Sequence, residues 1–225
     1  QNRTAGTAAA AEANVAVGKA IQKYQSWSSL SYKDRVLCGI FEGLTVNASQ
    51  HGLSPCLLEE AKALYKRFAD CRITRGENRE AAIAASVYVS CLNNGVTRSC
   101  KEIAQMFGVR SVALTKACKA FREVVRDTEA ATGTANATTA EDFVGRFCSR
   151  LGLDAVYVQE IREVLRRADE LSLACDSMPP SIAAGAISLI VERHRLPLTR
   201  ERIGEACVVA ATTVHKLQKK LAGAL

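Results

Sequence analysis

The chain of 225 residues is 48% hydrophobic and 24% charged, a composition typical of globular proteins, and its length suits one large domain or two small ones. Its mean hydropathy is close to zero and no apolar run reaches about 18 residues, so we expect a soluble protein without a membrane-spanning segment. The net charge of +7 lies mainly in residues 31–126, which hold 15 basic and 9 acidic side chains, and an anionic partner would meet much of its charge there.

Residues 1–30 form an N-terminal segment in which Ala8–Trp27 has partial helical periodicity and is a possible helix. The segment has no charged region followed by a hydrophobic block, so we expect no secretory signal. The absence of an initiating Met suggests a fragment or a processed chain.

The rest of the chain shows helical periodicity, because apolar residues recur at spacings of three and four. The clearest runs are Val36–Leu44, Leu57–Phe68 and Ile161–Ala168. Glycines and Pro179-Pro180 divide the chain into helices of about 8 to 20 residues. Several helices are preceded by polar residues suited to capping: Ser54, Ser99, Asp154 and Thr199. The predicted fold is all-α.

The two halves of the chain match each other at a shift of about 100 residues, in one register interrupted only at a linker and a loop. Matching pairs include Gly52 with Gly152, Arg67 with Arg167, Ile83 with Ile182, Ile103 with Ile203, Lys116 with Lys216 and Lys119 with Lys219. This register predicts two tandem five-helix repeats, 31–126 and 141–225, joined by a Thr- and Ala-rich linker at 127–140. The third helix of each repeat (Ala81–Cys91 and Ser181–Val191) is rich in small residues, so we expect it to be central and most buried.

The fourth and fifth helices of each repeat have helix-turn-helix spacing, at 99–116 and 199–216. The second helix of such a unit can enter the major groove of DNA, where short Thr, Ala and His side chains would face base edges and Lys would meet phosphates. A helix-turn-helix is also a common way to pack two helices, so the spacing alone leaves both interpretations open.

Nine cysteines are spread through the chain without a CxxC motif, and their odd number argues against a disulfide framework or a zinc site. We expect reduced thiols, buried at Cys91, Cys118 and Cys207, which favours the nucleus or the cytosol. The three histidines show no metal-ligand spacing. No Walker loop, dinucleotide-binding fingerprint, HExxH or GxSxG motif occurs, so an enzyme is not expected.

Several segments resemble the core of the transcription factor IIB family. They are Phe143–Leu153 with its Arg-Phe-Cys-Ser run, the third-helix strings at 82–91 and 181–187, and Arg-Ser-Cys-Lys-Glu-Ile-Ala at 98–104. The resemblance extends over about residues 31–222 and is that of a divergent member. It implies two cyclin-like repeats and the C-terminal core only, because the zinc ribbon that family members carry upstream is not visible. No cofactor is expected in this fragment.

The resemblance implies a nuclear, general transcription initiation factor that binds the TATA-binding protein, or a related factor, on promoter DNA. Such a core helps to recruit RNA polymerase II, and we expect a monomer without membrane association. Two alternatives stay open: a related initiation factor of RNA polymerase III or I, and a cyclin that acts as the regulatory subunit of a kinase. The basic helix-turn-helix units and the Arg-Phe-Cys-Ser segment favour the initiation factor over the cyclin.

The second helix-turn-helix departs from the family where family members read bases. Family members read a short DNA sequence upstream of the TATA element through a Val and an Arg. This chain has Thr212 and His215 at those two positions. The family's turn Gly is Val208 here, and the Lys pair that opens the fifth helix of the first repeat is Ser111-Val112. The family's sequence preference is therefore not carried over.

Phosphate contacts supply most of the affinity for DNA, so the candidate site residues are mainly basic. The candidate DNA contacts are Arg75, Arg79, Arg200, Arg202, Lys216, Lys219 and Lys220, with Thr212, Thr213 and His215 as candidates for base edges. The predicted basic face for an acidic loop of the TATA-binding protein consists of Arg98, Lys101, Arg110 and Lys116. A Lys or Arg on a helix is also often only solvated, and that interpretation stays open for each position.

Overall fold

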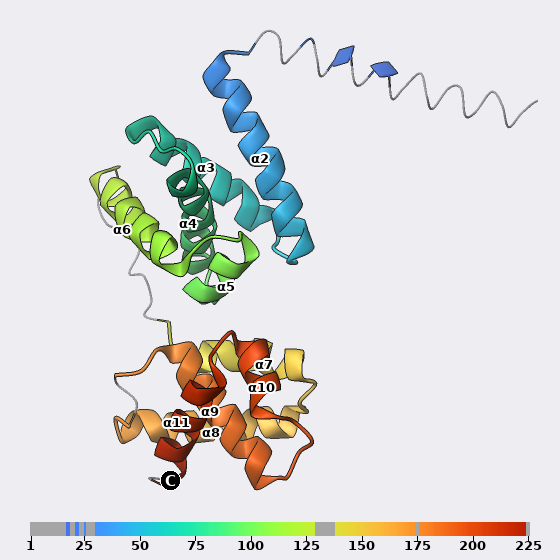
Figure 1. Cartoon of the computed structure of the whole chain (residues 1–225), viewed down its shortest axis with the longest axis vertical. Helices are drawn as coiled ribbons and strands as arrows, with labels where there is room; N and C mark the ends of the chain where they lie inside the picture. Colours follow the sequence, from blue (N-terminus) through green and yellow to red (C-terminus); the bar gives the residue numbers. More distant parts are fainter. Residues whose placement is uncertain are drawn as a thin grey trace, which may run out of the picture. The chain divides into compact units, whose positions relative to one another are not determined.

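The computed structural model describes residues 17–18, 21–22, 25, 30–128, 138–173 and 176–223. Over these residues the regular secondary structure is helical and includes the ten helices α2 to α11 (Figure 1), which confirms the all-α prediction. Of the possible helix at 8–27, the described residues are helical and the remainder lies outside them, as do 129–137 of the predicted linker. None of the helices described is long and apolar enough to cross a membrane.

The chain divides into two compact units, Gln1–Ser54 and Pro55–Leu225. The first unit contains α2 (Tyr32–Gln50), which begins after Ser31; the Ser31 hydroxyl accepts a hydrogen bond from the Asp34 N–H at 3.2 Å. The buried residues of this helix recur at helical spacing: Leu37, Leu44 and Ala48.

The second unit begins with four helices, α3 (Pro55–Cys71), α4 (Glu77–Asn93), α5 (Cys100–Met106) and α6 (Ser111–Thr128). Helix α4 packs against the other three, and Ala81 to Val87 are all buried. Phe68 of α3 stacks on Phe121 of α6 with ring centroids 4.3 Å apart. These contacts place α4 at the centre of its bundle.

The remaining helices form a second bundle: α7 (Glu141–Leu151), α8 (Ala155–Glu170), α9 (Pro179–Arg193), α10 (Arg200–Cys207) and α11 (Ala211–Ala222). Helix α9 packs against the other four, and every residue from Ala183 to Val191 is buried. A Cβ atom on Gly185 would lie 2.7 Å from Leu217 Cβ of α11, so only glycine permits this close approach. The central, buried position predicted for the third helices is confirmed.

Three of the predicted capping residues occupy N-cap positions, and two of them form cap hydrogen bonds. Ser99 and Glu102 make a reciprocal capping box at the start of α5. At the start of α10, Thr199 Oγ1 accepts a hydrogen bond from the Arg202 N–H at 3.3 Å. Asp154 precedes α8 but its side chain makes no cap bond.

Eight of the cysteines fall among the described residues and all eight are free thiols, while Cys175 lies outside that part of the chain. The burial predicted for Cys91, Cys118 and Cys207 is confirmed. Burial raises the pKa of Cys91 and Cys148 to about 11 and that of Cys207 to about 12. These three thiols are therefore protonated and unreactive near neutral pH.

Candidate nucleic-acid interface

Both predicted helix-turn-helix units are present, as α5–α6 and α10–α11. Their turns share one pair of backbone hydrogen bonds, the Schellman arrangement, which places one residue in the left-handed region. That residue is Gly108 in the first unit, with φ of 62°, and Val208 in the second, with φ of 55°. The bonds run from the N–H groups of Gly108 and Val109 to Gln105 and Ala104 at 3.3 and 3.0 Å, and from those of Val208 and Val209 to Glu205 and Gly204 at 3.3 and 2.9 Å.

Helix α11 has one buried side and one basic side. The buried residues are Val214, Leu217, Gln218 and Leu221. Thr212, Lys216, Lys219 and Lys220 are exposed, and their spacing of four, three and one residues places them on one face of the helix. None of the three lysines has a salt-bridge partner among the described residues. We call Lys216, Lys219 and Lys220 the lysine face.

Two of the candidates for base edges are less accessible than Thr212. Thr213 and His215 are half-buried at the sides of α11. The Nδ1 atom of His215 is buried and has no hydrogen-bond partner within the described part of the chain. Thr212 is therefore the base-edge candidate that the fold exposes beside the lysine face.

Arg200 and Arg202, at the start of α10, are exposed but already engaged. Arg200 Nε donates to Gln218 Oε1 at 3.2 Å, and its guanidinium lies 3.7 Å from Glu192. Gln218 is only 3% exposed, so the contact with Arg200 ties α10 to the buried side of α11. Arg202 lies 3.6 Å from Glu205 one turn along the same helix.

The two candidate DNA contacts in the first repeat differ in exposure. Arg75 is exposed in the connection between α3 and α4. Arg79, in the first turn of α4, is half-buried, and its Nε atom is buried without a hydrogen-bond partner among the residues described. Burial raises the pKa of Tyr65, although the nearby positive charge of Arg79 acts in the opposite direction.

The four residues predicted to face the TATA-binding protein divide into two pairs. Lys101 on α5 and Lys116 on α6 are exposed. Arg110 donates two hydrogen bonds to Glu77, at 2.5 and 2.6 Å, which hold the pKa of that carboxyl below its usual range. Arg98 is half-buried, and its burial lowers the pKa of its guanidinium.

Glu102 of α5 is a buried acidic side chain, 2% exposed, that the sequence reasoning missed. It accepts hydrogen bonds from Arg150 at 2.9 Å, from Arg146 at 3.1 Å and from the Ser99 N–H at 2.8 Å. Burial by itself would raise the pKa of Glu102, but these hydrogen bonds and the two arginine charges lower it, so the group is a carboxylate at neutral pH. We call Glu102, Arg146 and Arg150 the Glu102 cluster.

The Glu102 cluster joins helices of the two repeats within the unit Pro55–Leu225. Its arginines belong to α7, and they also donate to the carbonyl oxygens of Thr97 at 2.6 Å and Ala206 at 2.9 Å. The only sequence signals were the Ser-x-x-Glu capping pattern at 99–102 and the presence of Arg146 in the family-like segment. Neither signal indicates that Glu102 contacts Arg146, which lies 44 positions further along the chain.

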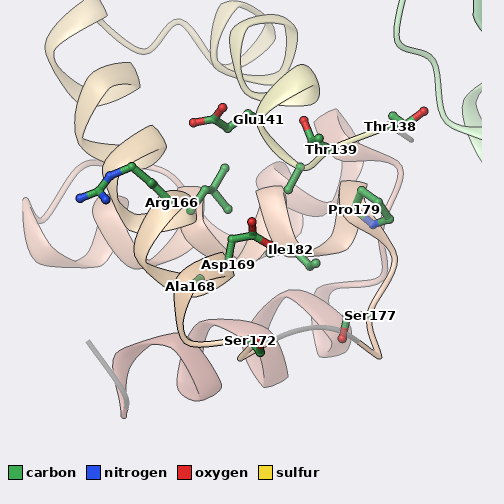
Figure 2. A pocket seen from close by; sticks show the side chains of 12 residues that line it. Thr138, Thr139, Glu141, Arg166, Ala168, Asp169, Ser172, Ser177, Pro179 and Ile182 are labelled. Carbon is green, nitrogen blue, oxygen red and sulfur yellow. The ribbon is translucent and has the colours of Figure 1, made fainter. Parts of the chain in front are cut away.

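A cavity of about 410 Å³ lies in the second bundle beside the starts of α7 and α9 (Figure 2). Its apolar lining comes from Leu165, Ala168, Pro179 and Ile182 among others. Arg166 borders it, but Glu163 at 2.7 Å and Glu170 engage its guanidinium. No predicted site residue lines this cavity, so it is separate from the candidate interface.

Comparison with known proteins shows which family this chain is similar to. The model of the Transcription factor TFIIB repeat matches residues 43–124, from within α2 to within α6. The transcription initiation factor IIB-like protein of Acanthamoeba polyphaga mimivirus is 31% identical over 216 residues, which cover 90% of this chain and 47% of that protein. The chain thus contains a transcription factor IIB repeat at residues 43–124 and is similar to a divergent C-terminal core of that family. This similarity agrees with the resemblance that the sequence predicted.

Cellular members of the family are more distant. Transcription initiation factor IIB of Xenopus laevis and of Homo sapiens are each 27% identical over 194 residues, covering 86% of this chain and 60% of the relative. The chain thus spans about half to three-fifths of the relatives it matches. Among solved structures, a viral cyclin from herpesvirus saimiri aligns with a TM-score of 0.39 and 14% identity over 88% of this chain and 90% of that one. The predicted fold class, two tandem five-helix cyclin-like repeats, agrees with the described helices and the family.

Proposed function

We propose that this chain is the core of a transcription initiation factor that binds promoter DNA together with the TATA-binding protein or a related factor, and that helps to recruit RNA polymerase II. Similarity to the transcription factor IIB family supports the proposal, since the relatives are named as initiation factors. The same kinship agrees with the expectation of a non-enzymatic protein. A nuclear location and a monomeric state belong to the proposal.

The lysine face of α11 carries the DNA-binding part of the proposal. Three lysines lie within two helical turns, exposed and without a salt-bridge partner in the described part of the chain, so their charge is available to an anionic ligand. Each lysine that neutralises a phosphate releases condensed counterions, and this gain does not depend on base sequence. This chain has Thr212 and His215 where family members have base-reading residues. Because phosphate contacts do not depend on those residues, most of the affinity for DNA should remain.

The first repeat supplies the surface proposed for the protein partner. Lys101 and Lys116 are exposed and would attract an acidic surface, with an effect that weakens as salt rises. Arg110 is paired with Glu77 and Arg98 is half-buried, so their replacement should alter stability as well as binding. Arg75 is the exposed candidate for phosphates of downstream DNA, and Arg79, four residues further along the chain, is half-buried.

An electrophoretic mobility-shift experiment tests the proposal. We expect the chain to shift a preformed complex of TATA-binding protein with promoter DNA and to do little on DNA alone. Lys216→Glu combined with Lys219→Glu should diminish the shift, because two phosphate contacts become repulsive.

A charge-matched control separates the lysine face from net charge. Lys66→Glu on α3 combined with Arg162→Glu on α8 reverses two exposed charges elsewhere and should leave the shift intact. An unchanged shift in the lysine-face variant, or an equal loss in the control, would refute the proposed contact. Transcription reactions with purified RNA polymerase II, III or I distinguish the polymerase served, and capture of a kinase without DNA binding would favour the cyclin alternative.

A further inference from the structure

The cavity of the second bundle has an apolar wall that continues the core of that bundle. We call it the second-bundle cavity; it is lined by the start of α7, the end of α8 and the start of α9. Leu165 and Ala168 of α8 belong to the buried core, and Pro179 and Ile182 of α9 are partly exposed beside them (Figure 2). The volume of about 410 Å³ lies within the range of ligand-binding pockets. An apolar side chain that entered the cavity would therefore extend the core.

Two carboxylates without an ion-pair partner also line the second-bundle cavity. Glu141 lies in the first turn of α7 and Asp169 in the last turn of α8, and both are exposed. Neither forms a salt bridge within the described part of the chain. Arg166 is the basic residue of the lining, and Glu163 and Glu170 already engage its guanidinium. The cavity therefore offers negative charge to a partner, on a chain whose net charge is +7.

This negative charge is not a property of the duplicated fold. At the shift of 100 residues, Glu141 corresponds to Phe41 and Asp169 to Ala69. The first repeat thus has uncharged residues at both positions, and the helices form there without carboxylates. The acidic lining is therefore specific to the second repeat.

Exposed apolar side chains flank the lining residues in the chain. Leu171 follows α8 and is next to Ser172 of the lining, while Met178 precedes α9 between Ser177 and Pro179 of the lining. Single exposed apolar residues are common on protein surfaces, but here two of them flank the lining of one apolar cavity. This favours a partner with several apolar side chains over a small ligand.

We propose that the second-bundle cavity is a docking site for a basic, amphipathic segment of a partner protein. An apolar side chain of the segment fills the cavity, and lysine or arginine side chains beside it pair with Glu141 and Asp169. The same carboxylates repel phosphates and acidic peptides, so the site takes ligands of the opposite charge to those of the lysine face. The docking needs only the second bundle and does not rest on the proposed function.

Binding of three designed peptides to the full chain tests the proposal. Each peptide has about 15 residues with leucine at helical positions i, i+3, i+4 and i+7, and the other positions are mostly lysine, glutamine or glutamate. Nuclear magnetic resonance follows isotope-labelled methyl groups of the chain. We expect the lysine peptide to shift the methyl signals of Leu165, Ala168 and Ile182, with an affinity that falls as salt rises. The glutamine peptide should bind several-fold more weakly, and the glutamate peptide should leave these signals unchanged.

Charge reversal at the cavity should invert this order. In Glu141→Lys combined with Asp169→Lys, the glutamate peptide should shift the cavity methyl signals and the lysine peptide should not. The matched control is Glu59→Lys combined with Glu123→Lys, which reverses two exposed carboxylates of the first repeat and should keep the parent order. Because the signals belong to residues of the cavity, binding of the glutamate peptide to the lysine face is distinguished from docking here.

The parent chain keeps the proposal falsifiable even where a variant does not fold. The proposal is overturned if the lysine peptide leaves the three cavity methyl signals unchanged, or if all three peptides shift them equally. It is also overturned if the charge-reversed chain binds the lysine peptide as tightly as the parent, or if duplex DNA shifts the same signals.

Discussion

The two helix-turn-helix units have the same backbone and place glycine in opposite places. The first unit has Gly108 at the left-handed turn position and Ala104 in α5, while the second has Val208 at the turn and Gly204 in α10. A Cβ on Gly204 would lie 2.6 Å from the Val209 carbonyl oxygen, so the second unit has no room for the alanine of the first. Helix-end hydrogen bonds thus preserve the duplicated fold, while each repeat places the strained turn residue and the close helix contact at different positions.

The same contrast appears at α5 and α10 in the treatment of charge. Glu102 is buried and bound by two arginines, whereas its counterpart at the shift of 100 residues, Arg202, is exposed. Glu102→Ala leaves Arg146 and Arg150 without their buried partner and should lower the free energy of unfolding by about 3 kcal/mol. Arg202→Ala should change it by less than about 0.5 kcal/mol. Urea unfolding followed by circular dichroism checks both, and equal midpoints for the two variants would contradict the role of the Glu102 cluster.

A second test concerns the close approach of α9 to α11. Gly185→Ala places a Cβ 2.7 Å from Leu217 Cβ and 3.3 Å from backbone atoms of α11, and should destabilise the chain by about 2 kcal/mol. Gly145→Ala on α7 is the matched control, since a Cβ there meets nothing within 4 Å. It should stabilise the helix by about 0.5 to 1 kcal/mol. Thermal unfolding measures both changes, and a neutral Gly185→Ala would show that α9 and α11 are farther apart.

The turn residues provide a reciprocal pair of substitutions. Val208→Gly relieves a β-branched residue in the left-handed region and should stabilise the chain by about 1 kcal/mol, less the contacts of its half-buried side chain. Gly108→Val introduces the same strain in the first unit and should destabilise by about 1 to 2 kcal/mol. Chemical denaturation of both variants measures these changes in stability, and changes of the same sign would contradict the opposite effects expected at the two turns.

The ends of the central helices contact a glutamate of the preceding helix through different partners. Glu60 of α3 receives hydrogen bonds from Asn93 at 2.6 Å and from Asn94, both neutral amides. Its counterpart Glu160 of α8 lies 3.0 Å from Arg193 and 2.6 Å from His194. The first repeat thus uses neutral partners where the second uses basic ones.

The smallest expected effect is the acid response of this second contact. Burial by itself would raise the pKa of Glu160, but His194 and Arg193 lower it below 4.5. A carboxyl whose pKa falls on folding stabilises the chain above its ordinary pKa, and this contribution is lost as pH falls through the folded value. Glu160→Gln should therefore show a flatter loss of stability than the parent chain between about pH 5 and about pH 3. Denaturant midpoints across that range check this, and parallel curves would contradict it.

Local patterns in the sequence predicted much of the fold. Apolar spacing gave the helices, the Ser99 and Thr199 caps form as expected, and the 100-residue register anticipated the paired helix-turn-helix units. The helices and their caps depend on residues within a few turns of each other, and the register repeats the same local pattern in both halves. The left-handed Val208 was anticipated only as a departure from a family glycine.

The candidate site was less predictable because its contacts join distant residues. Helical spacing exposes Lys216, but it does not reveal that Arg110 is paired with Glu77 at a separation of 33 residues. The contacts of Glu102 with α7 likewise depend on how the helices pack. Charge type could be predicted from the sequence, while the availability of each charge required the structure.

The salt dependence of assembly on promoter DNA tests directly whether the lysine face of α11 contacts phosphates. Affinity for the complex of TATA-binding protein with DNA is measured at several salt concentrations for the parent chain and for Lys216→Ala combined with Lys219→Ala. The slope of log affinity against log salt should be shallower in the variant by about 1.8, since each lost phosphate contact contributes about 0.9. An unchanged slope would show that the lysine face of α11 does not contact DNA.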